Sequence, residues 1–324
     1  MNHLNSIKTI LKSDLSHYDK TMRNTLLSDV KLINQVINYV TKKKGKQLRP
    51  VLTLLAANCC GKPNKDTYYA AALTEIIHIA TLVHDDIVDE ADTRRGWPSA
   101  KRIWKNKIST LIGDFMFSKA LTNMIHLKNF EALEMLSQTA NRLSQGEILQ
   151  IEKSLKKEMT EETYIKMVSD KTASLFSCAC KLGALTVNAD KKQKEAFKNF
   201  GEYFGLAFQM KDDLFDIMGK MSDIGKPTGF DVKKNMLTLP FIHLISTTDK
   251  QNKSKILSQL QYHAKRNELK NIRTMVESGG GIDYTMNKIK EISNKAENEL
   301  SIFEDSIFKN GLLDILKFNL NRII

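Results

Sequence analysis

The sequence predicts an all-α protein, on the basis of three observations. Apolar residues recur at helical spacing over most of the 324 residues. Only 5 prolines and 15 glycines occur, so few positions break a helix. No stretch alternates apolar and polar residues for long enough to build a sheet. The hydrophobic content of 42% provides a substantial core, as expected for a soluble globular protein.

The expected helices follow one another with short breaks where glycine, proline and charged residues gather. The stretch 66–90 is predicted to be a central helix, because its middle is apolar on most sides. None of the breaks is long enough for an interdomain linker, so we predict one domain over residues 1–324. Glycines 279–281 are expected to be a helix stop. The predicted helices are 21–43, 48–60, 66–90, 108–126, 129–155, 161–187, 190–219, 233–247, 252–261, 264–277, 282–303 and 306–321.

The formal net charge of +12 allows a nucleic-acid, an anionic membrane or a phosphorylated small molecule as partner. The lysines are widely spread, which is typical of solvated helix surfaces. A nucleic-acid-binding protein would need a concentrated basic face with stacking groups, and aromatic residues make up only 7%. We therefore expect no nucleic acid among the partners.

The remaining composition indicates a cytoplasmic protein. Cys59, Cys60, Cys178 and Cys180 form neither a CxxC pair nor a zinc-ligand spacing, so we expect reduced, buried thiols. The N-terminal residues lack the apolar core of a secretory signal. No apolar run approaches the roughly 20 residues of a membrane-spanning helix, although a transient contact with a membrane surface is compatible with the charge.

A DDxxD pattern occurs twice, each time at the C-terminal end of an apolar helical segment. Its first and last aspartates are four residues apart and therefore share one helix face. Three carboxylates at such short range repel one another unless a cation lies between them, and Mg²⁺ prefers carboxylate, water and phosphate oxygens. One copy alone is often a solvated helix end, but two copies favour Mg²⁺–diphosphate sites. The residues are Asp85, Asp86 and Asp89 in the first copy and Asp212, Asp213 and Asp216 in the second.

Basic and polar residues accompany both copies. GKQLRP brings a glycine and two cations to a helix N-terminus, where phosphate binds well. Taken singly, each cation is more often a surface charge. Together they indicate diphosphate groups held between metal ions and cations. The residues are Gly45, Lys46, Arg49, Arg94, Arg95, Lys171, Thr172, Gln209 and Lys226.

In this order, the motifs resemble those of the trans-isoprenyl (polyprenyl) diphosphate synthases of the long-chain octaprenyl and heptaprenyl type. The matching pieces span roughly residues 44–240: GKQLRP, EIIHIATLVHDDIVDEADTRRG, STLIGDFMFSKAL, DKTASLF, GLAFQMKDDLFDIMG, IGKPTGFD and LTLP. The resemblance implies an isoprenoid-synthase-type helical bundle around a central active-site cavity, and a homodimer. It also implies Mg²⁺-dependent, head-to-tail condensation of isopentenyl diphosphate onto an allylic prenyl diphosphate.

The same resemblance assigns roles to individual residues. Catalysis falls to Asp85, Asp86, Asp89, Asp212, Asp213 and Lys171, with Mg²⁺ held by Asp85, Asp89 and Asp212. The allylic diphosphate is assigned to Arg94, Lys171, Thr172, Gln209 and Lys226. Isopentenyl diphosphate is assigned to Gly45, Lys46, Arg49, His78 and Arg95. Read without the family, His78 is a common buried histidine of an apolar helix.

Product length is predicted from Ala80 and Thr81, just before the first motif. Short-chain relatives place bulky aromatics there, whereas these residues are small. Close packing against a neighbouring helix is the alternative explanation. We predict a long product for quinone side chains, with a shorter-chain farnesyl or geranylgeranyl diphosphate synthase as the alternative.

The chain departs from the family pattern at three positions. Lys44 replaces a glycine, Gln47 an arginine and Met236 a lysine. Two related activities are less well supported. A terpene cyclase would carry an NSE-type second metal motif, which the sequence lacks. A silent partner of a heteromeric synthase is disfavoured by two intact DDxxD motifs.

Overall fold

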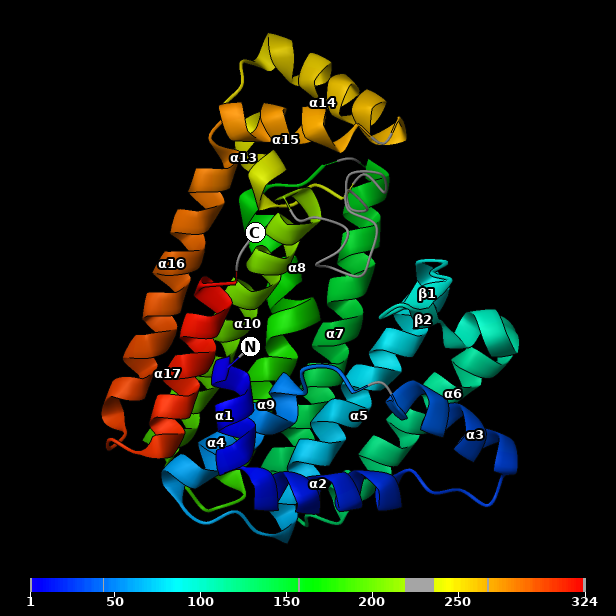
Figure 1. Ribbon diagram of the computed structural model, residues 1–324, viewed down its shortest axis with the longest axis vertical. Helices are drawn as coiled ribbons and strands as arrows, with labels where there is room; N and C mark the ends of the chain where they lie inside the picture. Colours follow the sequence, from blue (N-terminus) through cyan, green and yellow to red (C-terminus); the bar gives the residue numbers. More distant parts are fainter. Residues whose placement is uncertain (1, 43, 157, 219–235, 267, 323–324) are drawn as a thin grey trace. The chain divides into compact units, whose positions relative to one another are not determined.

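The structure is a computed structural model that describes residues 2–42, 44–156, 158–218, 236–266 and 268–322 (Figure 1). Over these ranges the chain is helical almost throughout, which confirms the all-α prediction. Among the same residues, the β-structure is confined to a hairpin of two-residue strands. None of the described helices is long and apolar enough to cross a membrane.

The chain divides into two compact units, and each is described by itself. Unit 1 comprises Met1–Ala140, Leu175–Gly201 and Glu299–Ile315. Unit 2 comprises Asn141–Ser174, Glu202–Asn298 and Leu316–Ile324. Five helices contribute residues to both units, so the division does not follow a linker. One domain over residues 1–324 stays a prediction.

Unit 1 contains the N-terminal helices. In chain order they are α1 (Asn2–Ile10), α2 (Lys12–Thr25), α3 (Lys31–Lys42), α4 (Leu48–Cys60), α5 (Lys65–Val88) and α6 (Ala100–Ile125). The unit also takes the first part of α7 (Phe130–Lys156), most of α9 (Ser174–Leu185), the first part of α10 (Lys191–Met218) and most of α17 (Ile307–Leu320).

Helix α5 forms the core of unit 1. Asn64 caps its N-terminus: its side chain accepts hydrogen bonds from the backbone N–H groups of Asp66 and Thr67. In turn, the backbone N–H of Asn64 donates to the Thr67 hydroxyl. The segment Ala70–Leu73 is fully buried, as are Ile76 and Ile77. The helix packs against α2, α4 and α6. The predicted central helix 66–90 is thereby confirmed in position, ending two residues early.

A tight hairpin follows α5. Strands β1 (Thr93–Arg94) and β2 (Trp97–Pro98) pair antiparallel around Arg95 and Gly96, which both have positive φ angles. Two left-handed residues in a two-residue loop are typical of a type I′ turn. Ser99 then caps α6 by accepting a hydrogen bond from the Arg102 backbone. The break expected between the predicted helices 66–90 and 108–126 is confirmed, although α6 begins at Ala100, eight residues before the predicted start. The two-residue strands are too short for a sequence pattern to reveal.

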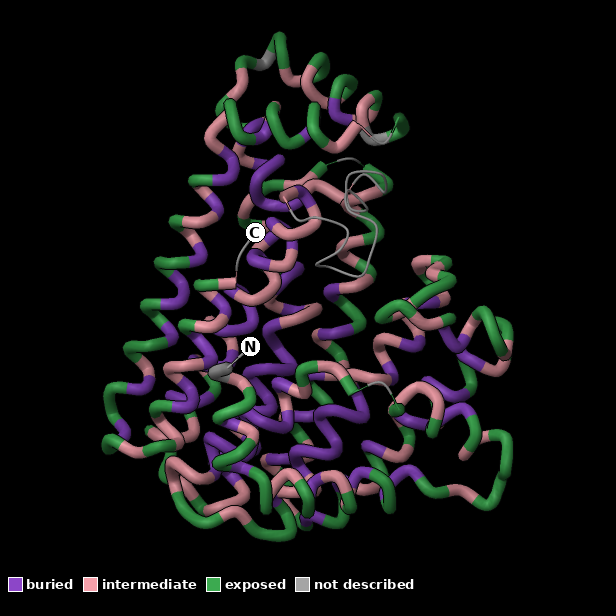
Figure 2. Tube along the Cα trace, in the orientation of Figure 1, coloured by how far each residue is buried: buried purple, intermediate pink, exposed green. Residues whose placement is uncertain are grey.

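Unit 2 contains the later helices. They are the second part of α7, α8 (Glu161–Val168), a π-helical turn (Ser169–Ala173), the second part of α10, α13 (Leu239–Ser246), α14 (Lys250–Lys265), α15 (Leu269–Ser278) and α16 (Gly281–Glu299). A 3₁₀ turn (Leu300–Ile302) follows α16. Along α16, buried and exposed residues alternate in short groups, as expected for an amphipathic helix (Figure 2).

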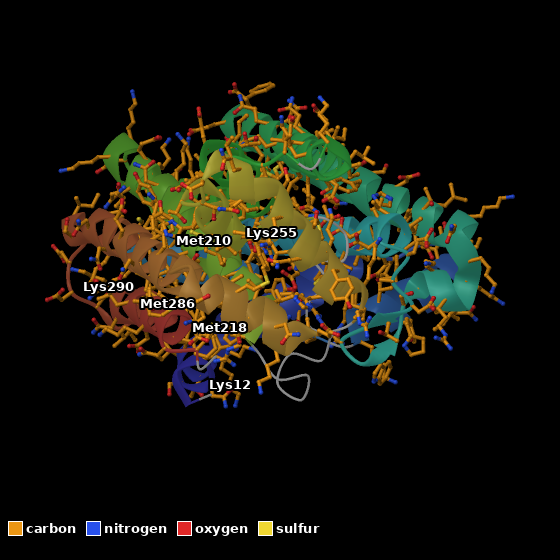
Figure 3. The ribbon with its side chains drawn as sticks, turned by 90° about the horizontal axis from the view of Figure 1, so that it is seen from above. Lys12, Met210, Met218, Lys255, Met286 and Lys290 are labelled. Atoms are coloured by element: carbon orange, nitrogen blue, oxygen red, sulfur yellow. The ribbon has the colours of Figure 1, made fainter. Side chains whose placement is uncertain are left out.

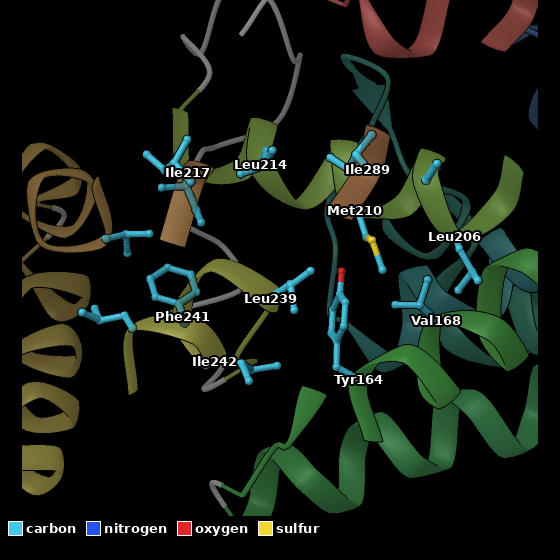
Figure 4. Close-up of a cluster of buried hydrophobic side chains, with 14 of the residues drawn as sticks. Tyr164, Val168, Leu206, Met210, Leu214, Ile217, Leu239, Phe241, Ile242 and Ile289 are labelled. Carbon is cyan, nitrogen blue, oxygen red and sulfur yellow. The ribbon is translucent and has the colours of Figure 1, made fainter. Parts of the chain in front are cut away.

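The core of unit 2 is built by α8, α10, α13 and α16. Tyr164, Leu214 and Phe241 are among its fully buried side chains (Figure 4). Three methionines, Met210, Met218 and Met286, join α10 to α16 at this core (Figure 3). Methionine is unbranched and flexible, so it fills irregular gaps between helices.

Two helix predictions need correction. The predicted helix 21–43 is wrong, because the chain forms α2 and α3 with a break over residues 26–30. Helix α2 also begins at Lys12, well before the predicted start, and buries Tyr18 and Met22. The predicted start of the helix 233–247 lies outside the described residues up to 235, and residues 236–238 are not helical.

The four cysteines are free thiols. Cys178 and Cys180 are buried as predicted, whereas Cys59 and Cys60 are half-buried. Burial raises the pKa of Cys59, Cys60 and Cys178 to about 12. Since the thiolate is the reactive form, these side chains act as small apolar groups.

Candidate active site

The first aspartate motif lies where α5 ends. Asp89 is the C-cap residue, and its backbone N–H donates to the Asp85 carbonyl at 2.8 Å. Asp85 and Asp89 are half-buried, whereas Asp86 is only 3% exposed. Carboxylates at a helix C-terminus meet the negative end of the helix dipole, so they require cations nearby.

Arg94 supplies a cation to the middle aspartate. Its Nε and Nη2 atoms both lie 2.8 Å from Oδ1 of Asp86. Ser99 ties the hairpin that carries Arg94 back to the helix end, because its hydroxyl donates to the Ala91 carbonyl at 2.7 Å. The diphosphate-binding role of Arg94 stays a prediction, and its guanidinium neutralises Asp86 in this structure.

The second aspartate motif lies near the end of α10. Asp212 and Asp216 are half-buried, and Asp213 is 6% exposed, so the exposure pattern of the first motif recurs. Tyr164 donates to Oδ2 of Asp213 at 2.5 Å, and Gln209 donates to Oδ1 at 2.8 Å. Burial raises the pKa of Asp213 to about 7, because two neutral donors do not offset the loss of hydration.

Asp212 lies beside a cation from the far end of the chain. Nη2 of Arg322 is 2.6 Å from Oδ1 of Asp212. Among the described residues, that shielded oxygen has no hydrogen-bond donor in good alignment. The guanidinium also lies over the rings of Phe208 and Phe215, 5.1 and 4.6 Å from their centres. A shielded carboxylate oxygen without an aligned donor suits a cation, so Asp212 fits the predicted metal-ligand role.

Lys171 lies on the π-helical turn of unit 2. Turns of this kind inside helices are frequent at functional sites. Its Nζ atom is 2.5 Å from Oε2 of Glu147 and 3.1 Å from Oε1 of Gln150. Helix α7 passes the turn so closely that a Cβ atom at Gly146 would lie 2.5 Å from the backbone nitrogen of Lys171. Glycine is therefore required where the two backbones meet.

Thr172 connects the same turn to the second aspartate motif. Its hydroxyl donates to Oε1 of Gln209 at 3.0 Å, and Gln209 donates in turn to Asp213. The sequence placed Gln209 one helical turn before Asp213, and the structure joins Thr172, Gln209 and Asp213 in one chain of hydrogen bonds. These three predicted residues thus come together within unit 2.

Arg142 anchors the other side of the π-helical turn. Its Nε atom lies 2.8 Å from Oδ1 of Asp170, and its Nη2 atom lies 2.8 Å from Oε1 of Glu202. Nη2 also donates to the hydroxyl of Ser169 at 2.7 Å. Three partners on one guanidinium fix the turn that carries Lys171.

Met236 occupies the position where the family pattern has a lysine. Its sulfur atom is 2.8 Å from Nε2 of Gln150, whose Oε1 atom accepts from Lys171. Gln150 therefore lies between Lys171 and Met236. One further predicted cation, Lys226, lies outside the described residues.

In unit 1, the segment 45–50 (GKQLRP) contacts the hairpin through Gly45 and Arg95. A Cβ atom at Gly45 would lie 2.5 Å from Nη2 of Arg95, so the guanidinium lies against the Gly45 backbone and would have to shift if a larger residue stood there. Gln47 has a positive φ of 55° immediately before α4, and Lys46, between Gly45 and Gln47, is exposed. The sequence prediction that Gly45 and Arg95 belong to one site agrees with this contact.

A buried carboxylate, Glu75, accompanies the predicted cations. It is 6% exposed, and its charge acts on the half-buried Arg49 and on Arg95. Burial lowers the pKa of Arg49 to about 10, and its guanidinium lies 4.3 Å from the centre of the Phe176 ring. Burial, together with Arg49 and Arg95, lowers the pKa of His78 well below its usual range. His78 is therefore neutral at physiological pH.

The two residues assigned to product length differ in burial. Ala80 is fully buried, and Thr81 is half-buried. The Thr81 hydroxyl donates to the His78 carbonyl at 2.8 Å, so its polar atom is satisfied by the helix itself. Both side chains are small, and both lie on α5 just before the first aspartate motif.

The aspartate oxygens of the two motifs are suited to hold Mg²⁺ only as part of a larger ligand set. Among the described residues, no three carboxylate, histidine or cysteine side chains converge into a metal cage. Mg²⁺ is usually held by one or two carboxylates together with water and substrate phosphates, rather than by an all-protein cage. A pair of half-buried aspartates one turn apart, as at Asp85 and Asp89, provides such a partial set.

Sequence reasoning missed five contributing residues: Glu75, Arg142, Glu147, Tyr164 and Arg322. Glu75 carried a usable signal, because an acid three residues before His78 in an apolar helix needs a partner. Arg322 carried none, since it lies 110 positions from Asp212 and only the fold brings them together.

Comparison with known proteins identifies the family. Residues 30–277 match the family model "Polyprenyl synthetase". The octaprenyl diphosphate synthase of Escherichia coli is 30% identical, over 99% of each chain. The geranylgeranyl diphosphate synthase of Methanosarcina mazei is 30% identical, over 96% of this chain and 97% of the relative.

A solved structure gives the same result for the fold. The polyprenyl synthase of Caulobacter crescentus, in complex with calcium and isoprenyl diphosphate, superposes with a TM-score of 0.91 at 29% identity. The superposition covers 98% of each chain. With the family model, the full-length relatives and the shared all-α fold in agreement, this chain belongs to the polyprenyl synthetase family of prenyltransferases.

Proposed function

We propose that this protein is a long-chain trans-polyprenyl diphosphate synthase that requires Mg²⁺. The proposal rests chiefly on the recurring exposure pattern of the two aspartate motifs. In each, the outer aspartates are half-buried and share one helix face, while the middle one is buried. The outer aspartates are thus the ones arranged for metal and substrate.

Asp85, Asp89 and Asp212 would hold the metal. When bound, Mg²⁺ neutralises the charge that develops on the departing diphosphate. A calcium ion and isoprenyl diphosphate in the Caulobacter crescentus structure are consistent with divalent-metal sites in the family.

The reaction joins two substrates at carbon. The allylic C–O bond breaks, which leaves a carbocation and diphosphate; the alkene of isopentenyl diphosphate then forms the new C–C bond. Loss of a proton to the released diphosphate restores neutrality, so no side-chain nucleophile is needed. Cationic and hydrogen-bonding groups that are already in place stabilise the leaving charge.

The residues of unit 2 hold the allylic diphosphate in this proposal. Lys171 supplies a cation that Glu147 and Gln150 keep in position. Thr172 and Gln209 are pre-oriented by their mutual hydrogen bond. Lys226 and, from unit 1, Arg94 complete the predicted set.

The residues of unit 1 hold isopentenyl diphosphate. Gly45, Lys46, Arg49 and Arg95 supply backbone space and positive charge, and the neutral His78 supplies a ring nitrogen. When no substrate is bound, the charge of Glu75 offsets the mutual repulsion of Arg49 and Arg95 and so keeps these two arginines close together.

Small side chains at Ala80 and Thr81 support a product longer than geranylgeranyl diphosphate. The geranylgeranyl diphosphate synthase among the relatives keeps the shorter product as the alternative. Thr81→Phe should shorten the product, whereas Thr81→Val, which keeps the size, should not. An unchanged length in Thr81→Phe would exclude Thr81 as the determinant.

The incubation that tests the function uses labelled isopentenyl diphosphate, farnesyl diphosphate and Mg²⁺, with chromatography of the dephosphorylated products. We expect extended chains with Mg²⁺ and none with a chelator. Absence of any extended chain would refute the proposed synthase. A long product would suit the side chain of a quinone made in the cytoplasm.

A homodimer is proposed as well. Along α6 and at the start of α7, Leu111, Leu121, Ile125 and Phe130 expose 55, 40, 64 and 88% of their surfaces. Large apolar side chains in such a row mark protein interfaces. Analytical ultracentrifugation should give twice the chain mass of 36.9 kDa. Ile125→Glu should shift the protein towards the monomer; a monomeric wild type would contradict the proposal.

A further inference from the structure

A groove on the N-terminal helices belongs to none of the roles described above. It has a volume of about 590 Å³ and is lined by α1 and α2 alone. Four of its lining residues are cations: Lys8, Lys12, Lys20 and Arg23. Its remaining lining residues are Leu15, Ser16, Asp19 and Asn24.

The positive charge of this groove is not cancelled by the protein. Asp19, its one carboxylate, is held by Lys44 through both oxygens, at 2.6 and 2.7 Å. Asp14, the other acid of α2, accepts hydrogen bonds from Asn58 and Tyr68. Within the described ranges, the four groove cations form no ion pair with a carboxylate. Unpaired cations side by side repel each other, so an anionic partner would stabilise them.

Exposed apolar residues continue from the end of the groove. Leu27, Val30 and Leu32 follow Arg23 along the chain and expose 61, 54 and 39% of their surfaces. Asp29, also exposed, is the acid among them. Basic side chains next to exposed leucine and valine are the combination by which interfacial helices bind anionic membranes.

We propose that the α1–α2 groove and the apolar segment after it dock the protein on an anionic lipid surface. The four cations contact lipid phosphates, and Leu27, Val30 and Leu32 enter the boundary between headgroups and acyl chains. The residues of this docking surface are separate from those assigned to the substrates. The proposed function gives it a use, because a long prenyl chain is insoluble in water and must pass to lipid.

The test is co-sedimentation with phosphatidylcholine vesicles that either contain or lack phosphatidylglycerol. We expect wild-type protein to bind only the anionic vesicles. Lys12→Gln/Lys20→Gln should bind about thirtyfold more weakly, as expected for two basic residues near an anionic surface. The matched control Lys255→Gln/Lys290→Gln removes the same charge from exposed positions in unit 2 and should bind like wild type (Figure 3).

Three results would overturn the proposal: no binding by the wild type, equal weakening in both double variants, or no weakening in either. A fourth would be saturable calorimetric binding of inorganic diphosphate that Lys12→Gln/Lys20→Gln abolishes, because the groove would then take a soluble anion. Prenyl transfer in detergent should be unchanged in this variant. Failure of transfer in the wild type would refute the synthase and leave the vesicle result standing.

Discussion

The two aspartate motifs share a spacing and an exposure pattern, but they treat the middle carboxylate differently. In unit 1, Asp86 is neutralised by Arg94 in an ion pair at 2.8 Å. In unit 2, Asp213 receives hydrogen bonds from the uncharged Tyr164 and Gln209, and its pKa rises. In the proposed function, the outer aspartates of each motif bind metal and substrate, whereas the middle aspartate is held within the fold by its protein partners.

The largest expected effect comes from the outer aspartates. Asp85→Asn and Asp212→Asn should each lower kcat by about 100- to 1000-fold, the usual loss when a group that stabilises transition-state charge is removed. Steady-state assays with Mg²⁺ measure this, and circular dichroism checks that each variant is folded. If either variant kept wild-type kcat, that aspartate would not be a metal ligand.

The middle aspartates should differ from each other in stability. Asp86→Asn removes one partner of a largely buried ion pair and should cost about 2 kcal/mol, less than a fully buried pair because the Arg94 side chain is 22% exposed. Asp213→Asn removes a buried charge and can keep the Tyr164 bond, so it should be neutral or stabilising. Urea unfolding of metal-free protein measures both, and equal losses would erase the contrast between the motifs.

The pH dependence of stability should give unit 1 a signature of its own, because His78 lies on helix α5 of that unit. Its pKa in the folded protein lies well below the usual 6.5. Unfolding raises that pKa, so the stability contributed by neutral His78 is present above pH 6.5 and declines as the pH falls below it. The limiting slope is about 1.4 kcal/mol per pH unit. His78→Gln should remove this slope; an unchanged slope between wild type and variant would show that the pKa of His78 is not lowered in the folded protein.

The smallest effect concerns Arg322, whose guanidinium contacts Asp212. Arg322→Gln should tighten Mg²⁺ binding up to about fivefold, the range expected when a partly exposed ion pair no longer competes. Calorimetry without substrate is the appropriate measurement. Weaker binding in the variant would show that Arg322 supports the metal site rather than competing with it.

Much of this molecule could be predicted from local sequence signals. Helical periodicity located α4, α5, α7 and most later helices, because their apolar faces repeat over several turns. The spacing of DDxxD correctly placed Asp85 and Asp89 one turn apart. The break between α2 and α3 was missed, since residues 26–30 contain no proline or glycine to mark it.

The partners of the site residues were harder to predict. Asp86 and Asp85 are neighbours of identical chemistry, and only the helix packing decides which one is buried. Arg142 and Tyr164 reach their partners through contacts between helices that are distant in sequence. The close approach of the π-helical turn at Lys171 to Gly146 likewise has no sequence signature, because the two residues lie on different helices.

The most direct test of the different roles of outer and middle aspartates is a Mn²⁺ titration in the presence of inorganic diphosphate, with bound Mn²⁺ measured by electron paramagnetic resonance. Four variants are compared: Asp85→Asn, Asp86→Asn, Asp212→Asn and Asp213→Asn. We predict that the two outer variants lose bound Mn²⁺, while both middle variants bind as the wild type does. Loss of Mn²⁺ in the middle variants equal to that in the outer ones would contradict the account.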